Sequence, residues 1–378
     1  MLQSTLICRT CGRNYSVSEK IWRCACGGLF DLVYNPQFDP DLIKKRKPNL
    51  WRYREAIPIE NDSAIISFEE GFTPLLEINI AGIPILVKQE HLFQTGSYKD
   101  RGATVLISKS KELGINHVVE DSSGNAGCAI AAYAARAGIK CDIYVPESTS
   151  PAKLAQIESY GARLHKIPGS REDTTRAVQV AAETCYYASH SWNPFFFQGT
   201  KTIAFEIWEQ LGWQVPNVLV LPVGNGTLLL GAYFGFQDLL IAGMISEIPQ
   251  LVGVQAQNCS PLAQAFAEPL SQFSSVSSSA TIAEGIAIAE PIRAEEILRA
   301  VKHSGGRFVT VTDGEITLAL KDTMHSGFYI EPTSATVIAA ISKISGSLIN
   351  QKVVTVFSGH GLKSTEKILS LLNHKFQP

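Results

Sequence analysis

A lysine in a turn of small residues is the most informative chemical feature of the chain. Residues 96–102 read Gly-Ser-Tyr-Lys-Asp-Arg-Gly, with Lys99 at the centre. The apolar run at residues 83–89 before this turn is typical of a strand, and residues 103–113 after it predict a helix. A side chain at such a junction can point into a binding site, and a lysine whose amine is neutral can attack a carbonyl carbon. Lys99 is therefore a candidate for forming a Schiff base, although a solvated lysine at a helix start would show the same local pattern.

Two glycine-containing loops lie where expected strands meet expected helices. The first, residues 121–128 (DSSGNAGC), follows a strand expected at 117–120 and begins an alanine-rich helix. The second, residues 222–227 (PVGNGT), stands between a similar strand and an apolar helix. Unpaired N–H groups at a helix start bind anions, and glycine lets the backbone approach a phosphate closely. Neither loop matches the P-loop or the G-x-G-x-x-G dinucleotide pattern, so each alone could also be an ordinary turn of an α/β fold.

Four of the eight cysteines crowd the N-terminus. Cys8, Cys11, Cys24 and Cys26 follow the pattern C-x2-C…C-x-C, while the other four are scattered in apolar segments typical of core thiols. Disulfides are not expected in a reducing cytosol. Two cysteine pairs separated by a hairpin-like stretch, residues 12–23, resemble a zinc ribbon, although only one residue separates the second pair. A ribbon that folds without metal is the alternative.

Composition restricts the class of protein further. The chain has 378 residues, of which 45% are hydrophobic, and a net charge of −2. This length predicts two to three domains. The near-zero charge argues against a nucleic acid or an acidic membrane as partner, and no apolar run reaches the ~20 residues that span a bilayer. The N-terminus lacks the features of a secretory signal, so we expect a cytoplasmic protein.

The order of these motifs resembles that of fold-type II pyridoxal-phosphate (PLP) enzymes, which are built like the tryptophan synthase β subunit. The shared features are an S-[FY]-K-D-R-G lysine motif, an S-G-N loop and a later G-N-G loop. Longer strings point to the threonine synthase family, and the resemblance covers nearly the whole chain. They include PAKLAQIESYGA from Pro151, FFFQGTKTIAFEIWEQLG from Phe195 and FSGHGLK from Phe357.

The resemblance implies an α/β fold with two doubly wound open-sheet domains and an N-terminal zinc-ribbon-like module. We expect the module at residues 1–35 and a smaller mobile domain at 105–190. Residues 51–104 and 191–378 would form the larger PLP-binding domain. Family resemblance also implies a homodimer.

The resemblance gives each candidate residue a role. Lys99 would bind PLP covalently and transfer protons, and Asn125 would contact the phenolic oxygen of the cofactor. Ser358 would face the pyridine nitrogen, where a neutral serine would not hold the ring protonated; a capping hydroxyl beside Gly359 is the alternative. The cofactor phosphate would be bound by Gly224, Asn225, Gly226, Thr227 and the N–H of Leu228. The amino-acid substrate would be bound through its carboxylate by Ser122, Ser123 and Gly124, with Ala126 beside them, and the metal, if present, by Cys8, Cys11, Cys24 and Cys26.

The reaction is less sharply specified than the cofactor. Threonine synthases convert O-phosphohomoserine and water to threonine and phosphate, and therefore need a second anion site. The family pattern has a threonine after the S-G-N asparagine and an asparagine closing the second loop, where this chain has Ala126 and Leu228. Lys153, Arg171 or Lys201 could supply the missing polarity. We expect a threonine synthase-like lyase.

Two other functions stay open. Residues 283–286 (AEGI) resemble ammonia-lyases and racemases. A PLP-dependent β-elimination or β-replacement enzyme, similar to a serine/threonine ammonia-lyase or a cysteine synthase, is therefore the main alternative. The third is a PLP-binding regulatory protein without turnover, which the intact Lys99 motif disfavours.

Overall fold

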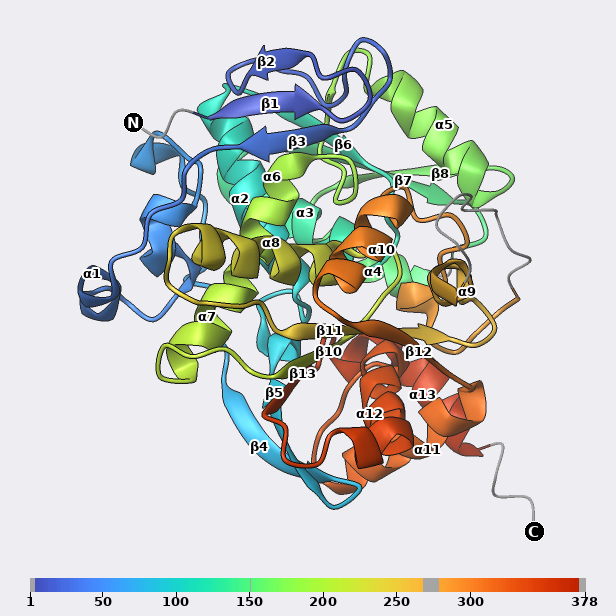
Figure 1. Ribbon diagram of the computed structural model, residues 1–378. Helices are drawn as coiled ribbons and strands as arrows, with labels where there is room; N and C mark the ends of the chain where they lie inside the picture. The colour runs from blue at the N-terminus through green and yellow to red at the C-terminus, as the bar shows by residue number, and fades with distance from the viewer. Residues whose placement is uncertain (1–3, 150, 268–278, 374–378) are drawn as a thin grey trace. The chain divides into compact units, whose positions relative to one another are not determined.

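The computed structural model describes residues 4–149, 151–267 and 279–373, and the chain divides into two compact units (Figure 1). The first unit contains Met1–Phe72 and Lys99–Thr202, and the second contains Thr73–Tyr98 and Ile203–Pro378. The chain therefore passes from the second unit to the first at the peptide bond before Lys99. The domain limits expected from the sequence stay a prediction.

A three-stranded antiparallel sheet begins the first unit. It contains β1 (Thr5–Cys8), β2 (Asn14–Ser16) and β3 (Phe30–Val33) in the order β2-β1-β3. Buried side chains of this sheet, including those of Leu6 and Phe30, belong to the same hydrophobic core as the helices of the unit. The N-terminal module is thus packed into the first unit rather than held apart from it.

A four-stranded parallel sheet forms the rest of the first unit, in the order β8-β7-β6-β9. Parallel neighbours need a crossover connection, usually a helix, and their central strands are apolar because helices cover the sheet. The strands are β6 (His117–Glu120), β7 (Lys140–Pro146), β8 (Arg163–Ile167) and β9 (Tyr186–Tyr187), and the helices are α1 (Pro40–Lys45), α2 (Lys99–Glu112), α3 (Asn125–Ala137), α4 (Pro151–Ser159), α5 (Arg171–Ala181) and α6 (Pro194–Thr200).

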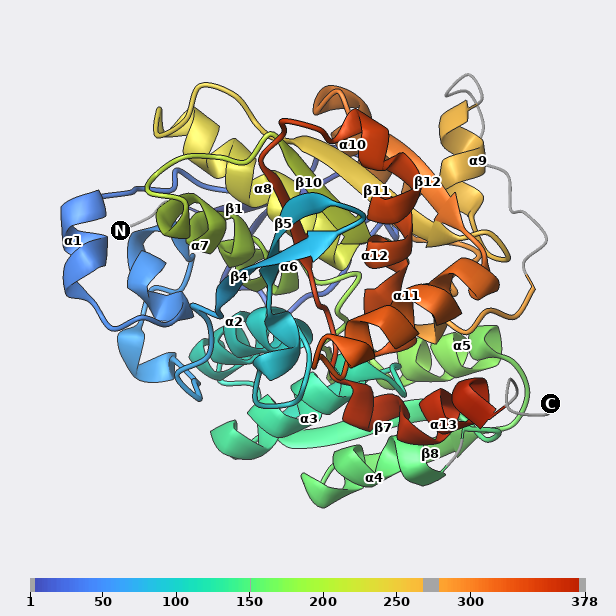
Figure 2. The ribbon, with the colours of Figure 1, turned by 90° about the horizontal axis from the view of Figure 1, so that it is seen from below.

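A six-stranded sheet forms the second unit, in the order β12-β11-β10-β13-β5-β4, and only β4 is antiparallel to its neighbour. Helices α8 and α10 cover one face and α11 and α12 the other (Figures 1 and 2), as a doubly wound sheet requires. The strands are β4 (Leu75–Ile80), β5 (Ile83–Lys88), β10 (Val218–Pro222), β11 (Gln250–Ala256), β12 (Arg307–Val311) and β13 (Val353–Val356). The helices are α7 (Thr202–Gln210), α8 (Thr227–Ile241), α9 (Pro261–Ala267), α10 (Ala294–His303), α11 (Asp313–His325), α12 (Pro332–Ile344) and α13 (Thr365–Asn373).

One element boundary differs from expectation in a way that matters for the site. The helix expected at residues 103–113 begins at Lys99 itself. Asp100 lies in its first turn, where a carboxylate interacts favourably with the positive end of the helix dipole. Lys99 is therefore held by helical geometry and does not lie in a flexible turn.

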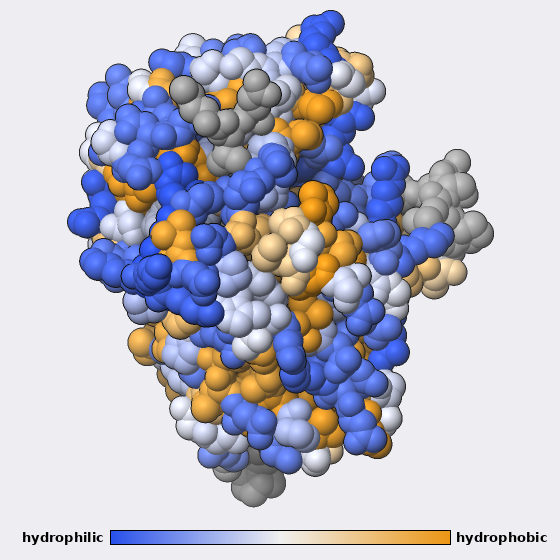
Figure 3. Space-filling view, turned by 60° about the vertical axis from the view of Figure 1, so that its left-hand side comes forward, coloured by the Kyte–Doolittle hydropathy of each residue, from blue (hydrophilic) through white to orange (hydrophobic). Residues whose placement is uncertain are grey.

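The surface is mixed in character. Figure 3 shows hydrophilic and hydrophobic residues interspersed over one face of the molecule. Within the described part of the chain, no helix combines the length and the apolar character needed to cross a membrane.

Candidate active site

The backbone just before Lys99 is fixed to the end of strand β13. The N–H of Tyr98 donates to the carbonyl of Ser358 at 3.1 Å, and the N–H of His360 donates to the carbonyl of Gly96 at 2.9 Å. Both bonds join segments of the second unit. They place the peptide that leads into Lys99 beside a residue expected to face the cofactor ring.

Tight packing between α2 and α6 positions the Lys99 side chain within the first unit. Lys99 is half-buried, and its Nζ lies 5.9 Å from the centre of the Phe196 ring. A Cβ atom on Gly102 would come within 2.4 Å of that ring, so the glycine is what lets Phe196 approach. The buried guanidinium of Arg101 donates to the hydroxyl of Thr202 at 3.0 Å, which ties α2 to the first residue of α7, directly after α6.

The second glycine loop forms a cradle at the start of α8. Gly226 is the N-cap of this helix, with φ of +74°, and no side chain caps the first N–H groups. A Cβ on Gly226 would lie 2.3 Å from the Ile297 side chain, so this position fits only glycine without rearrangement. The hydroxyl of Thr227 lies 2.8 Å from that of Tyr98. The N-terminus of a 15-residue helix, with a hydroxyl at its first residue, fits a phosphate.

A pair of buried hydroxyls follows β13. The Oγ atoms of Ser358 and Ser334 are 3.1 Å apart, and Ser358 is 3% exposed. The N–H of Gly359 donates to Ser334 at 3.0 Å, so it is Ser334, rather than Ser358, that bonds this glycine. The Ser358–Ser334 pair is uncharged, as expected for the ring nitrogen partner of a fold-type II enzyme.

The first glycine loop leaves the start of α3 open. Gly124 is the N-cap of α3 and has no side-chain cap, while the hydroxyl of Ser122 accepts a bond from the Gly124 N–H at 3.3 Å. Ser123 and Asn125 are half-buried, and Gly124 is exposed. A carboxylate could therefore approach the N-terminus of this helix, where the helix dipole favours an anion. Ala126 is 2% exposed and adds no polar group.

Three cationic side chains could replace the polar contacts to the substrate phosphate that Ala126 and Leu228 cannot make, and their surroundings differ. Lys201 is buried, and its Nζ lies 4.5 Å from the centre of the Tyr34 ring. Arg171 is exposed at the first residue of α5. The side chain of Lys153 lies outside the described residues. Of the two described cations, Arg171 is the one with an accessible side chain.

The four N-terminal cysteines come together as their spacing predicts. Their sulfur atoms all lie within 4.8 Å of one another, with 3.5 Å between Cys8 and Cys26 and 3.6 Å between Cys11 and Cys24. Four thiolates around a zinc ion at about 2.3 Å would lie about 3.8 Å apart, so the geometry suits that metal. The Tyr15 hydroxyl, 3.2 Å from Cys24, lowers the pKa of that thiol to about 6 and favours a thiolate ligand.

Comparison with known proteins identifies the class. Residues 66–359 match the family model described as pyridoxal-phosphate dependent enzyme, and the chain belongs to this family. More particularly, it is a threonine synthase-like member. It is 38% identical over 375 residues to a threonine synthase of Methanocaldococcus jannaschii, which covers 95% of this chain and 93% of the relative. A threonine synthase of Methanosarcina acetivorans is 34% identical, covering 97% and 94%.

Solved structures show the same fold. Maize serine racemase superimposes with a TM-score of 0.69 at 20% identity, covering 80% of this chain and 92% of that one. A threonine deaminase of Solanum lycopersicum gives a TM-score of 0.69 at 20% identity, covering 90% and 91%. At this identity, the similarity establishes the fold-type II architecture and leaves the reaction to be argued from the site.

Proposed function

We propose that this protein is a PLP-dependent lyase that converts O-phosphohomoserine and water to threonine and phosphate. The observation that carries the proposal is the 38% identity to a threonine synthase over 95% of the chain, with the lysine motif and both glycine loops in the expected order. The small molecule that the enzyme binds besides PLP would be an amino-acid substrate.

The residues divide the work as follows. When bound, PLP withdraws electrons from the substrate carbon next to the amino group. Lys99 would hold the cofactor covalently and move protons at its Nζ. Gly224, Asn225, Gly226, Thr227 and the N–H of Leu228 would bind the cofactor phosphate. Asn125 and Ser358 would orient its ring, and Ser122, Ser123 and Gly124 would bind the substrate carboxylate.

A specific observation keeps a second function in view. Ala126 and Leu228 are 2% and 1% exposed, and neither side chain can bond the substrate phosphate. Each absent charge-assisted bond would weaken phosphate binding by about 1.5–3 kcal/mol, roughly tenfold to a hundredfold. β-Elimination or β-replacement on a smaller amino acid is therefore the alternative.

The test is a product assay. Purified enzyme with PLP is given O-phosphohomoserine, and phosphate release and threonine are measured together, with Lys99→Ala as the control. We expect equal amounts of both products from the wild type and none from the variant. Deamination of serine or threonine, with no phosphate released from O-phosphohomoserine, would move the assignment to the alternative.

We also propose a structural zinc ion at Cys8, Cys11, Cys24 and Cys26. The support is the sulfur geometry and the packing of β1 and β3 into the first unit. Metal analysis should give about one zinc per chain. Cys8→Ser should lower the zinc content and the melting temperature, whereas the same change at the buried Cys259 should leave the zinc content unaltered. Metal-free protein with an unchanged melting temperature would contradict the proposal.

Family resemblance supports a cytoplasmic homodimer. Light scattering on the purified protein should give about twice the mass of one chain, and fluorescent tagging in cells should give a diffuse cytoplasmic signal. A monomer in solution would refute the first part.

A further inference from the structure

A buried acid–base pair lies at the end of strand β6. The Nδ1 atom of His190 is 2.7 Å from Oε1 of Glu120, and the two side chains are 7% and 0% exposed. The other carboxyl oxygen, Oε2, has no hydrogen-bond partner among the described residues. The backbone N–H groups of His190 and Asp121 also bond to the Glu120 carboxyl group, so this side chain joins the end of β6 to the segment that carries His190.

The pair is placed beside the residues proposed for chemistry. Glu120 is the last residue of β6 and directly precedes the loop proposed for the substrate carboxylate. The His190 ring packs edge-on against Phe196, with centroids 6.1 Å apart, and Lys99 Nζ lies 5.9 Å from that same Phe196 ring. Lys99 and His190 thus share one aromatic neighbour. The adjacent Asp121 is engaged elsewhere, because it accepts a bond from the Tyr187 hydroxyl at 2.8 Å.

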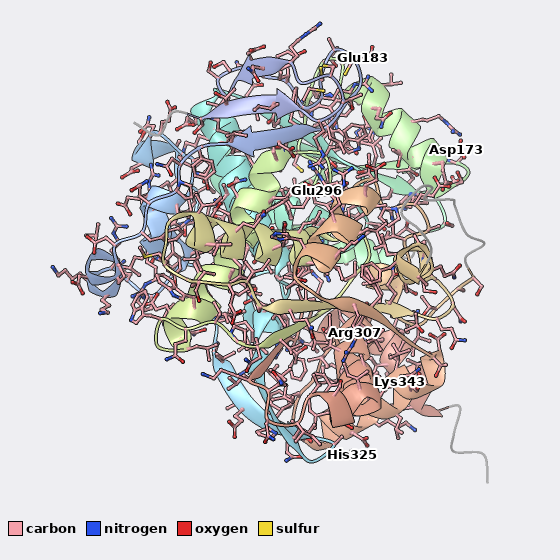
Figure 4. All side chains as sticks on the ribbon, viewed as in Figure 1. Asp173, Glu183, Glu296, Arg307, His325 and Lys343 are labelled. Atoms are coloured by element: carbon pink, nitrogen blue, oxygen red, sulfur yellow. The ribbon has the colours of Figure 1, made fainter. Side chains whose placement is uncertain are left out.

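The charges around the pair favour two neutral partners. Burial, assisted by the Asp121 carboxylate, raises the pKa of Glu120 well above its ordinary value. Burial, assisted by the positive charges of Lys99 and Arg171, lowers the pKa of His190 well below its ordinary value. Arg171 begins α5, whose first turn is marked by Asp173 in Figure 4. A carboxyl proton shared with Nδ1 leaves Nε2 as the N–H donor of His190.

We propose that His190, oriented by Glu120, is the acid that protonates the substrate's leaving group; the inference rests on the proposed lyase function. The carbon–oxygen bond to the leaving group breaks, and its electron pair passes to the oxygen. His190 gives its Nε2 proton to that oxygen while its Nδ1 takes the carboxyl proton of Glu120, so the ring stays neutral and Glu120 becomes a carboxylate. In O-phosphohomoserine, Lys99 removes one proton from the carbon next to the amino group and one from the neighbouring carbon, and the electron pair left on that second carbon forms the new carbon–carbon double bond as the carbon–oxygen bond breaks. When water adds to that second carbon, it gives a proton back to Nε2 and the Nδ1 proton returns to Glu120, while Lys99 returns the two carbon protons, one to the terminal carbon and one to the carbon next to the amino group.

The first test needs no turnover. Nitrogen NMR of the cofactor-free protein reports the protonation of the His190 ring, with His190→Gln used to assign its signals. We expect a neutral ring with its proton on Nε2 at pH 7. A doubly protonated ring, or a neutral ring with its proton on Nδ1 directed at a Glu120 carboxylate, would overturn the assignment of His190 as the donor.

The second test uses the leaving group. A departing oxygen needs a proton, whereas chloride from 2-amino-4-chlorobutanoate, the chloro analogue of O-phosphohomoserine, does not. His190→Gln should lower kcat/KM about a hundredfold or more for O-phosphohomoserine, the usual contribution of a general acid, and less than about threefold for the chloro analogue. Glu120→Gln should act in the same direction. His165→Gln is the matched control, because His165 also contacts a carboxylate, that of Asp142 at 3.1 Å, on the same sheet.

The outcomes separate the two proposals. Equal losses for both leaving groups would overturn the role of His190 and leave the lyase assignment intact. Turnover of serine in place of O-phosphohomoserine would overturn the proposed substrate. The two leaving groups would then be compared with serine and β-chloroalanine as substrates. If Glu120→Gln lowered kcat/KM equally for both leaving groups while His190→Gln did not, the proposed role of Glu120 in orienting His190 would be contradicted.

Discussion

The two glycine loops have similar sequences but are held very differently. At the start of α8, residues Gly224, Gly226, Thr227 and Leu228 are all buried, and the Thr227 hydroxyl contacts Tyr98. At the start of α3, Gly124 is exposed and Ser123 half-buried. Both loops leave the first N–H groups of a helix without a side-chain cap.

This difference shows how a glycine loop at a helix N-terminus can suit two kinds of ligand. A rigid, enclosed cradle suits a resident group, because little conformational entropy is lost on binding. An open loop suits a group that must arrive and leave in every cycle. The comparison therefore supports the proposal that the α8 loop binds the cofactor phosphate and the α3 loop the substrate carboxylate, and each role can be tested separately.

The largest effect is expected at the enclosed loop. Gly226→Ala places a side chain at φ of +74° and against Ile297. The left-handed conformation costs about 1–2 kcal/mol, and the added contact costs more. Affinity for PLP, measured by titration of the cofactor-free protein, should fall about tenfold to a hundredfold. Gly346→Ala is the control, since nothing lies within 4 Å of that position and its PLP affinity should not change.

A smaller and different effect is expected at the open loop. Ser123→Ala removes one donor to the substrate carboxylate, so KM should rise about tenfold, as expected for the loss of a hydrogen bond to a charged group. PLP affinity should stay at the wild-type level. A variant that lost PLP while retaining its KM would reverse the assignment of the two loops.

The smallest effect is expected where the lysine segment meets the enclosed loop. Tyr98→Phe removes the hydroxyl that contacts Thr227 at 2.8 Å. A neutral hydrogen bond contributes about 0.5–1.5 kcal/mol, so PLP affinity should fall between twofold and about tenfold. Thr227→Val, which also removes a phosphate ligand, should cost more than Tyr98→Phe. The opposite order would argue against Thr227 as a phosphate contact.

Local sequence patterns predicted the strands and loops because these depend on neighbouring residues. The strand expected at residues 117–120 is β6, and the cysteine spacing correctly predicted a cluster. The predicted start of helix α2 was four residues too late, at Ala103 instead of Lys99, because the helical spacing of apolar residues begins only at Ala103.

Partners that come from distant segments could not be predicted in this way. Ser334 meets Ser358, and Glu120 meets His190 across 70 residues of chain. No periodicity or turn signal records such a contact, because only the folded sheets bring these side chains together. Lys201 is a case in which the residue type misled. A lysine there suggested a site for the substrate phosphate, but in the structure its amine packs over the Tyr34 ring.

The central claim is that Lys99 carries the cofactor, and one measurement tests it most directly. Holoenzyme is reduced with borohydride, which fixes a lysine-bound cofactor, and the modified peptide is located by mass spectrometry. We predict one modification per chain, on Lys99, and none in Lys99→Ala. Modification of the variant at the wild-type level, for example at the buried Lys88 or Lys201, would contradict the account.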